Sequence, residues 1–193
     1  MTVRVVTDSA CDLPAHTVTE HRITVVPLTI RFGDQDFVDR EQLTPAEFWS
    51  KCAAAAELPS TAAPAPGQFE TTFRQLVAEG ATSIVSINLS AALSATMQSA
   101  ELAARSVADT VQVTVIDSQQ VTLGIGVIVA EAARLARRWP CRPRVSSACA
   151  VRSACWSQPA GTGRAALSKA PTRARSWCSG RPRHASRASS TLH

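Results

Sequence analysis

Short runs of β-branched residues alternate with helical segments along most of the chain, and this alternation constrains the fold more than any other feature. Val3 to Val6 is a β-branched run that predicts a strand buried on both faces, and residues 83–88 and 111–116 repeat the pattern. Between them lie helical segments, the clearest of which begins at Thr44, where a capping residue is followed by proline and then by glutamate. This order of elements predicts a layered α/β/α domain with a mostly parallel sheet.

The other elements give weaker signals. The helix that begins at Thr44 is expected to turn Phe48, Trp49 and Cys52 towards the core. Residues 58–67, rich in proline and small side chains, are expected to form a loop. The remaining expectations are a strand at 23–30, a hairpin with a returning edge strand at 32–39, and helices at 69–79, 97–107 and 122–137.

Charge divides the chain into two parts. All fifteen acidic residues lie at or before Glu131, where the chain has seven basic residues and therefore a net charge of −8. The residues after Glu131 carry the other thirteen basic side chains and no acidic one. We therefore predict an α/β domain over residues 1–137 and a separate basic tail, rich in Arg, Ser and Ala, over residues 138–193.

The composition of this tail is unusual for a folded domain. It lacks Asp, Glu, Ile, Phe, Met, Asn and Tyr, yet it holds Trp139, Trp156 and Trp177. We expect it to be disordered, although natural disordered tails are usually poor in Trp and Cys. Since Arg, Ala, Pro, Gly, Trp and Cys share GC-rich codons, our hypothesis is that a shifted reading frame produced the tail and truncated the native protein. The alternative is a basic nucleic-acid-binding tail, for which no specific recognition motif is present.

Several classes of protein lack support in the sequence. The start enters a strand pattern without a secretory signal, and the longest apolar stretch, residues 121–129, is too short to span a bilayer. A cytoplasmic protein is therefore expected. The six cysteines form no Cys-x-x-Cys pair and have no zinc-finger spacing, so we expect no metal, no disulfide framework and no cofactor.

Loops rich in hydroxyl groups mark the candidate site. In parallel sheets ligands bind beyond the carboxyl ends of the strands, where we expect residues 7–12, 88–96 and 117–122, joined by residues 60–66. A position just before a helix favours an anion, because unpaired N–H groups gather there; the simpler alternative is that each hydroxyl only caps its helix. The hydroxyl residues are Ser9, Ser60, Thr61, Ser90, Ser94, Thr96, Ser118 and Thr122.

A catalytic base is hard to find beside these hydroxyls. The α/β part has only His16 and His21, both close to the first helix and both expected to be exposed. It also lacks a Gly-x-Ser-x-Gly elbow, a Walker A lysine and a carboxylate cluster with metal-ligand spacing. These loops suit holding a carboxylate or phosphate better than breaking a bond.

Taken together, four segments resemble the DegV family. They are Val6-Thr-Asp-Ser-Ala-Cys-Asp-Leu-Pro14, Val25-Val-Pro-Leu28 leading to Phe32-Gly-Asp34, Pro59-Ser-Thr-Ala-Ala-Pro64 and Leu89-Ser-Ala-Ala-Leu-Ser-Ala-Thr-Met-Gln-Ser-Ala100. A weaker fifth match is Ile116-Asp-Ser118 with Gly124 and Gly126. The resemblance covers residues 3–137.

This resemblance implies a two-domain, non-enzymatic carrier that binds long-chain fatty acids such as palmitate between its domains and presents them to a fatty-acid kinase, acting in lipid transport or fatty-acid metabolism. By the same resemblance Thr61 and Ser94 hold the fatty-acid carboxylate. The sequence departs from the family at Ala62, where a second serine is usual, and at Ala95, where glycine is usual. Without the second half of the tunnel we expect weak or absent binding by this chain. The other open alternative is an acyl- or phosphoryl-transfer enzyme that uses the same Ser/Thr loops.

Overall fold

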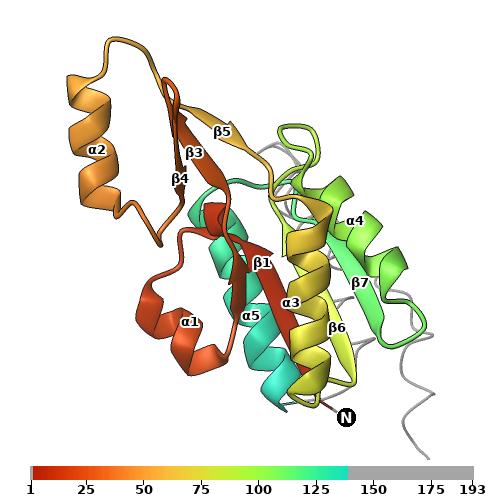
Figure 1. Cartoon of the computed structure of the whole chain (residues 1–193). Coiled ribbons are helices and arrows are strands. Elements are labelled where there is room, and N and C mark those ends of the chain that lie inside the picture. The colour runs from red at the N-terminus through yellow and green to blue at the C-terminus, as the bar shows by residue number, and fades with distance from the viewer. Residues whose placement is uncertain (1, 139–193) are drawn as a thin grey trace, which may run out of the picture. The chain divides into compact units, whose positions relative to one another are not determined.

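A four-stranded sheet forms the centre of the described part of the chain, which is residues 2–138 of a computed structural model (Figure 1). Its strand order is β2-β1-β6-β7, and all three pairings are parallel. This confirms the predicted α/β class with a mostly parallel sheet. The strands are β1 (Val3–Asp8), β2 (Thr24–Val26), β6 (Ser83–Asn88) and β7 (Gln112–Asp117).

Helices cover both faces of this sheet, as the β-branched runs predicted. Neighbouring residues of a strand point to opposite faces, so Val5 packs into the cluster on the α5 side while Val6 packs with Phe69 and Phe73 of α3. Both clusters exclude water, and Val6 and Phe73 are fully buried. The helices on the first face are α1 (Ala15–His21) and α5 (Leu123–Arg138), and those on the second are α3 (Pro66–Ala78) and α4 (Thr96–Ser106).

The segment after β1 is packed closely against α5. A short 3-10 helix, η1 (Ser9–Cys11), contacts α5 at Gly126. A Cβ atom at Gly126 would lie 2.4 Å from the carbonyl oxygen of Cys11 and 3.0 Å from Leu13 Cδ2. Only glycine allows this approach, which holds the loop that follows the central strand.

A second, three-stranded antiparallel sheet has the order β4-β3-β5. Its hairpin turns at Gly33 with a φ of +57°, which confirms the hairpin predicted at 32–39. Two other expectations were wrong. Residues 23–30 are two strands in two sheets, interrupted at Pro27, which has no N–H for a ladder. The expected loop at 58–67 contains a strand paired with β3. The strands are β3 (Thr29–Phe32), β4 (Gln35–Val38) and β5 (Ser60–Ala62).

The helix α2 (Pro45–Ala54) has the predicted capping box: the Thr44 hydroxyl accepts from the Glu47 N–H, and the Glu47 carboxylate accepts from the Thr44 N–H. The expectation that Phe48, Trp49 and Cys52 enter the core was wrong. No residue of α2 is buried, and Trp49 is 70% exposed. The helix lies instead against the second sheet, where the Phe48 ring is 5.9 Å from that of Phe32.

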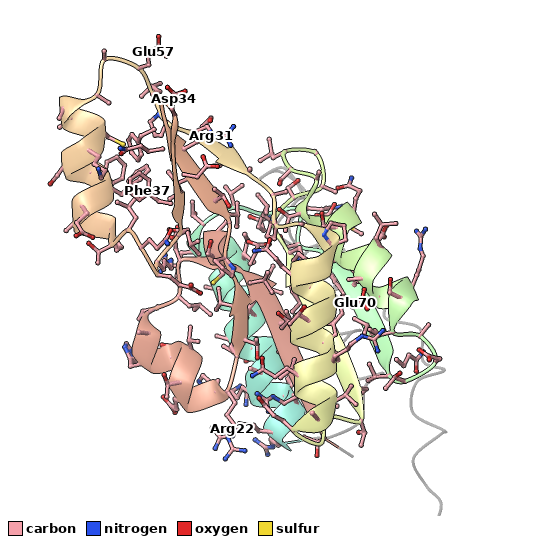
Figure 2. All side chains as sticks on the ribbon, viewed as in Figure 1. Arg22, Arg31, Asp34, Phe37, Glu57 and Glu70 are labelled. Atoms are coloured by element: carbon pink, nitrogen blue, oxygen red, sulfur yellow. The ribbon has the colours of Figure 1, made fainter. Side chains whose placement is uncertain are left out.

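Figure 2 shows the Phe37 side chain on the α2 side of the second sheet, where Lys51 Nζ lies 4.8 Å from its ring centroid. On the same sheet, Arg31 forms a bidentate ion pair with Asp36. A three-stranded sheet and one helix offer too little surface to bury an aromatic helix face, which explains the exposure of Trp49.

The tail predicted for residues 138–193 lies outside the described residues, except for Arg138, which ends α5. The tail's predicted disorder and its reading-frame origin remain predictions. In the described residues 2–138, no helix combines the length and the apolar character needed to cross a bilayer.

Candidate ligand site at the carboxyl edge of the sheet

Three neighbouring strands of the parallel sheet each end on a side chain with an acceptor oxygen. Asp8 ends β1, Asn88 ends β6 and Asp117 ends β7. Since these strands are parallel and adjacent, as the ribbon in Figure 1 shows, the three residues that end them lie along one edge of the sheet. The loop after β1 and the loop after β6 diverge from this edge, which is the arrangement that forms ligand crevices in open α/β sheets.

Asp8 joins the ends of β1 and β6. Its carboxylate is fully buried and accepts hydrogen bonds from the N–H of Leu89 (2.8 Å) and of Ala10 (3.2 Å) and from the Asn88 side-chain amide (3.3 Å). Burial raises the pKa of the Asp8 carboxyl, while these donors act in the opposite direction. Asp8 therefore holds the two strand ends in position. Both of its carboxylate oxygens are buried and hydrogen-bonded, so neither is available to a ligand.

Asp117 and the turn after it hold the loop that follows β6. One carboxylate oxygen of Asp117 accepts from the N–H of Ala91 (3.2 Å) and of Gln119 (2.8 Å). The backbone N–H of Ser90 donates to the carbonyl of Gln120 (3.0 Å). The loop at 89–95 is thus tied to β1 through Asp8 and to β7 through Asp117. The roles of Asp8 and Asp117 in holding this loop were not predicted from the sequence, although an Asp or Asn residue ends each of the three strands.

Ser94 lies near the end of this loop, two residues before α4 begins. Its half-buried hydroxyl lies 2.9 Å from the Thr96 hydroxyl and accepts from the Thr96 N–H at 3.3 Å. The next N–H groups of α4 have no partner within the helix, because the first turn of any helix leaves them free. The hydroxyl of Ser94 and this helix end together form a small donor group suited to an anion.

Thr61 lies in β5, opposite Ile30 of β3, and its side chain is exposed. It comes five residues before α3, as Ser94 comes two residues before α4. Helices α3 and α4 pack against each other and lead into parallel strands β6 and β7, so both begin at the carboxyl edge. The structure brings both loops to this edge; no hydrogen bond joins Thr61 to Ser94 in the described residues.

Several of the other predicted hydroxyls have structural partners. Ser9 is buried and accepts from the Leu28 N–H at 3.0 Å, which ties η1 to the chain after β2. Ser118 is buried and accepts from the Gln120 N–H at 3.1 Å. These two hydroxyls hold backbone segments in place, Ser9 between distant parts of the chain and Ser118 within a turn, and neither caps a helix.

A cavity of about 400 Å³ with both apolar and charged lining residues lies at the same end of the sheet but on the α1 face. Cys11, Leu13 and Val18 line it together with Val25 and Pro27. Neither Thr61 nor Ser94 lines this cavity, so it is separate from the donor group at α4. Burial raises the pKa of the Cys11 thiol, which makes this cysteine a packing residue rather than a nucleophile.

The two histidines of the described residues stand away from the hydroxyl loops. His16 is exposed on α1, and His21 ends α1 beside Val3 and Val5, at the opposite end of β1 from Asp8. The expectation that both are exposed was wrong for His21, which is half-buried. No group of three or more metal-ligating side chains is present in residues 2–138.

A four-stranded parallel sheet with helices on both faces and hydroxyl-bearing loops at its carboxyl edge defines this chain as an α/β domain of the open-sheet class. The sequence model described as "Uncharacterised protein, DegV family" matches residues 2–138. The chain belongs to the DegV family, which confirms the resemblance seen in the sequence.

Individual relatives agree with this assignment. A DegV domain-containing protein of Clostridium perfringens is 33% identical over 133 residues, which is 69% of this chain and 47% of the relative. The chain therefore spans about half the length of the curated relatives that it matches.

Two solved structures show the same fold. A DegV family protein from Thermus thermophilus, described by its fatty acid binding, has a TM-score of 0.73 and 33% identity, covering 80% of this chain and 54% of that chain. The fatty acid kinase B3 protein of Streptococcus pneumoniae, described as loaded with linoleic acid, has a TM-score of 0.66 and 27% identity. It covers 80% of this chain and 55% of that chain.

Proposed function

We propose that residues 2–138 form the headgroup half of a fatty-acid site, in which Ser94 and Thr61 bind the carboxylate of a long-chain fatty acid such as palmitate. The observation that carries this proposal is the Ser94 hydroxyl at the start of α4, in a loop held from two sides by Asp8 and Asp117. The fatty acids named for the Thermus and Streptococcus relatives support the choice of ligand.

The magnitudes explain why a headgroup half alone binds weakly. A helix end contributes about 0.3–1 kcal/mol to binding an anion, and a hydrogen bond to a charged group about 1.5–3 kcal/mol. Burying each CH₂ of an acyl chain contributes about 0.8 kcal/mol, so a long chain gains on the order of 10 kcal/mol when it is enclosed. Most of the affinity therefore depends on enclosure by a second wall, which the relatives' additional length can supply.

The same geometry favours a carrier over an enzyme. The Ser94 hydroxyl has Thr96 as its partner, with no histidine, lysine or carboxylate in hydrogen-bonding contact among the described residues. An acyl- or phosphoryl-transfer enzyme needs such a base beside its nucleophile. A carrier shows no turnover by itself, and a fatty-acid kinase is the proposed partner. Cytoplasmic localisation remains a prediction.

The length and composition of the basic tail, residues 138–193, also bear on this proposal. The family match ends at residue 138, where the acidic domain gives way to the basic tail. We keep the hypothesis of a shifted reading frame, and sequencing of the gene tests it: an α/β pattern in another frame after Arg137 supports it. The alternative nucleic-acid-binding tail predicts a steep loss of DNA affinity with salt that disappears when residues 138–193 are removed.

Mass spectrometry of extracted lipids tests the proposed function. We would compare this chain with a version translated in the alternative frame after Arg137, both purified from the same host. Fatty acid in the second protein alone supports a headgroup half that needs a second wall. Fatty acid in both means that residues 2–138 suffice for binding, and no fatty acid in either contradicts the proposal.

A further inference from the structure

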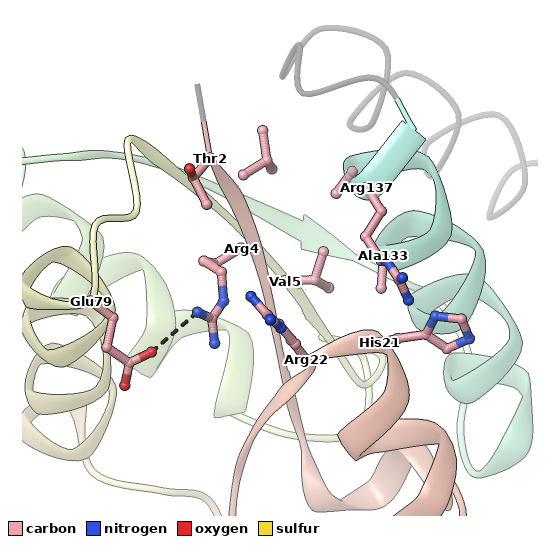
Figure 3. A pocket seen from close by; sticks show the side chains of 10 residues that line it. Thr2, Arg4, Val5, His21, Arg22, Glu79, Ala133 and Arg137 are labelled. Atoms are coloured by element: carbon pink, nitrogen blue, oxygen red, sulfur yellow. Dashed lines mark hydrogen bonds and ion pairs between the residues drawn. The ribbon is translucent and has the colours of Figure 1, made fainter.

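A second cavity, of about 400 Å³, opens at the amino end of β1, on the opposite end of the sheet from Ser94 (Figure 3). Its walls come from four parts of the fold: the start of β1, the end of α1, the last turns of α5 and Glu79 at the end of α3. Four basic or titratable nitrogen-bearing side chains line it. They are Arg4, His21, Arg22 and Arg137.

The positive charge of this cavity is only partly neutralised. Glu79 is its one acidic lining residue and pairs with Arg4 at 3.1 Å. Arg137 donates to the backbone carbonyl of Glu20 at 3.1 Å, which leaves its charge uncompensated. Arg22 has no ion pair in the described residues, and no acidic side chain follows Glu131 in the sequence. Three guanidinium groups and one carboxylate therefore line the cavity.

Two nitrogen atoms in the walls are buried without a hydrogen-bond partner. They are Arg4 Nε and His21 Nδ1. The Arg4 side chain is only 18% exposed, so water reaches it poorly. Buried polar atoms in proteins are nearly always paired, so Arg4 and His21 each keep a hydrogen-bonding atom that no described residue uses.

Helix ends alone do not explain this arrangement. Helices α1 and α5 both end at the cavity, and basic residues at a helix C-terminus interact favourably with its partial negative charge. That accounts for Arg22 and Arg137. It does not account for Arg4, which comes from the central strand β1, or for its unpaired Nε. Figure 3 shows Arg4 reaching from β1 towards Glu79, Arg22 next to the start of β1, and His21 and Arg137 near α5.

We propose that this cavity binds a phosphate group, either inorganic phosphate or a small phosphomonoester. Guanidinium groups match the oxygen atoms of a phosphate with paired N–H donors, and the net positive charge suits a dianion. The apolar lining is limited to small side chains such as Val3, Val5 and Ala133, which give little grip for a lipid chain. This site is independent of the fatty-acid proposal, because it lies at the other end of the sheet.

NMR of the His21 ring in the full chain tests the proposal, because this signal reports the cavity and not the basic tail. Inorganic phosphate and glycerol phosphate would be titrated separately at constant pH, with sodium chloride holding the ionic strength fixed. The spectrum of His21→Gln identifies the ring signal. We expect the chemical shift of the His21 ring to change with phosphate and to saturate. Comparing the two affinities shows whether the cavity prefers the free anion or the monoester.

Matched substitutions decide whether the cavity is responsible. Arg22→Gln removes a charge but keeps a non-glycine residue at a φ of +52°, and we expect it to weaken binding about tenfold or more. Arg137→Gln is a second variant for the case that the first unfolds. Arg31→Gln, on the second sheet, serves as the control and should leave the affinity unchanged. No saturable shift with either ligand, or equal weakening by Arg31→Gln, overturns the proposal.

Discussion

Replacing Gly126 with alanine tests how tightly the loop after the central strand is packed on α5. The new Cβ atom would lie 2.4 Å from the carbonyl oxygen of Cys11, a distance that real Cβ atoms essentially never show. The atom in its way belongs to the backbone, which cannot rotate aside as a long side chain does. Either α5 or η1 must therefore move. If η1 moves, the hydrogen bond that the Leu28 N–H donates to the Ser9 hydroxyl is disturbed as well.

The expected loss of stability follows from two opposing terms. Inserting one methyl group into a packed interior costs about 1–3 kcal/mol, and contact with backbone places Gly126→Ala at the upper end of that range. Alanine in a helix interior regains about 1 kcal/mol relative to glycine. We expect a net loss of about 2 kcal/mol in the free energy of unfolding, which lowers the urea midpoint by about 1 M.

Urea denaturation followed by far-UV circular dichroism measures this difference. The matched control is Gly124→Ala, in the first turn of the same helix, whose Cβ would meet the side chain of Gln120 at 3.1 Å. A flexible side chain can yield, so we expect the control to change stability by less than about 1 kcal/mol. If Gly126→Ala proves as stable as the wild type, the close packing of η1 on α5 is refuted.

Three further predictions concern single side chains. Burial raises the pKa of Asp8. Its contribution to the free energy of unfolding is therefore fully present below the ordinary aspartate pKa and is lost as the pH rises through the raised pKa. Asp8→Asn should lack this pH dependence when unfolding is measured over the same pH range. Thr44→Ala should lower the local stability of α2 by about 1 kcal/mol, measured as faster amide exchange confined to that helix. Cys11, buried and with a raised thiol pKa, should react with iodoacetamide more slowly than the half-buried Cys52, as peptide mapping will show.

The main sheet was predictable because its strands carry their own signal. The β-branched runs at Val3 and Val111 need no knowledge of their partners, since burial on both faces requires apolar residues at nearly every position. The capping box at Thr44 was likewise readable, because a cap is a local interaction over four residues. Helix α3 begins at Pro66, three residues before the expected start, with the Gln68 side chain accepting from the Ala65 N–H.

The second sheet was not predictable from local pattern. Strand β5 exists because Thr61 pairs with Ile30, about thirty residues earlier in the chain, and a loop composition hides that pairing. The exposure of Trp49 has the same origin, because a helix face becomes buried only if a large enough surface lies opposite. At the candidate site, the hydroxyl of Ser94 was found from its place before a helix, whereas the roles of Asp8 and Asp117 depend on how three strand ends meet.

A comparison of octanoate with octanol tests whether Ser94 and Thr61 form the proposed carboxylate site. The two ligands share an apolar chain and differ in the carboxylate, and both are soluble enough to reveal weak binding by NMR of the backbone amides. Ser94→Ala and Thr61→Ala remove the proposed donors. Ser60→Ala is the control, since neighbouring side chains of β5 point to opposite faces.

We predict that octanoate shifts the amide signals of Thr61 and of residues 90–97, and that octanol leaves them in place. Loss of a hydrogen bond to a charged group, about 1.5–3 kcal/mol, should weaken octanoate binding by about tenfold or more in Ser94→Ala and leave Ser60→Ala unchanged. Equal shifts with octanol, or an unchanged octanoate affinity in Ser94→Ala, would contradict a carboxylate site at the start of α4.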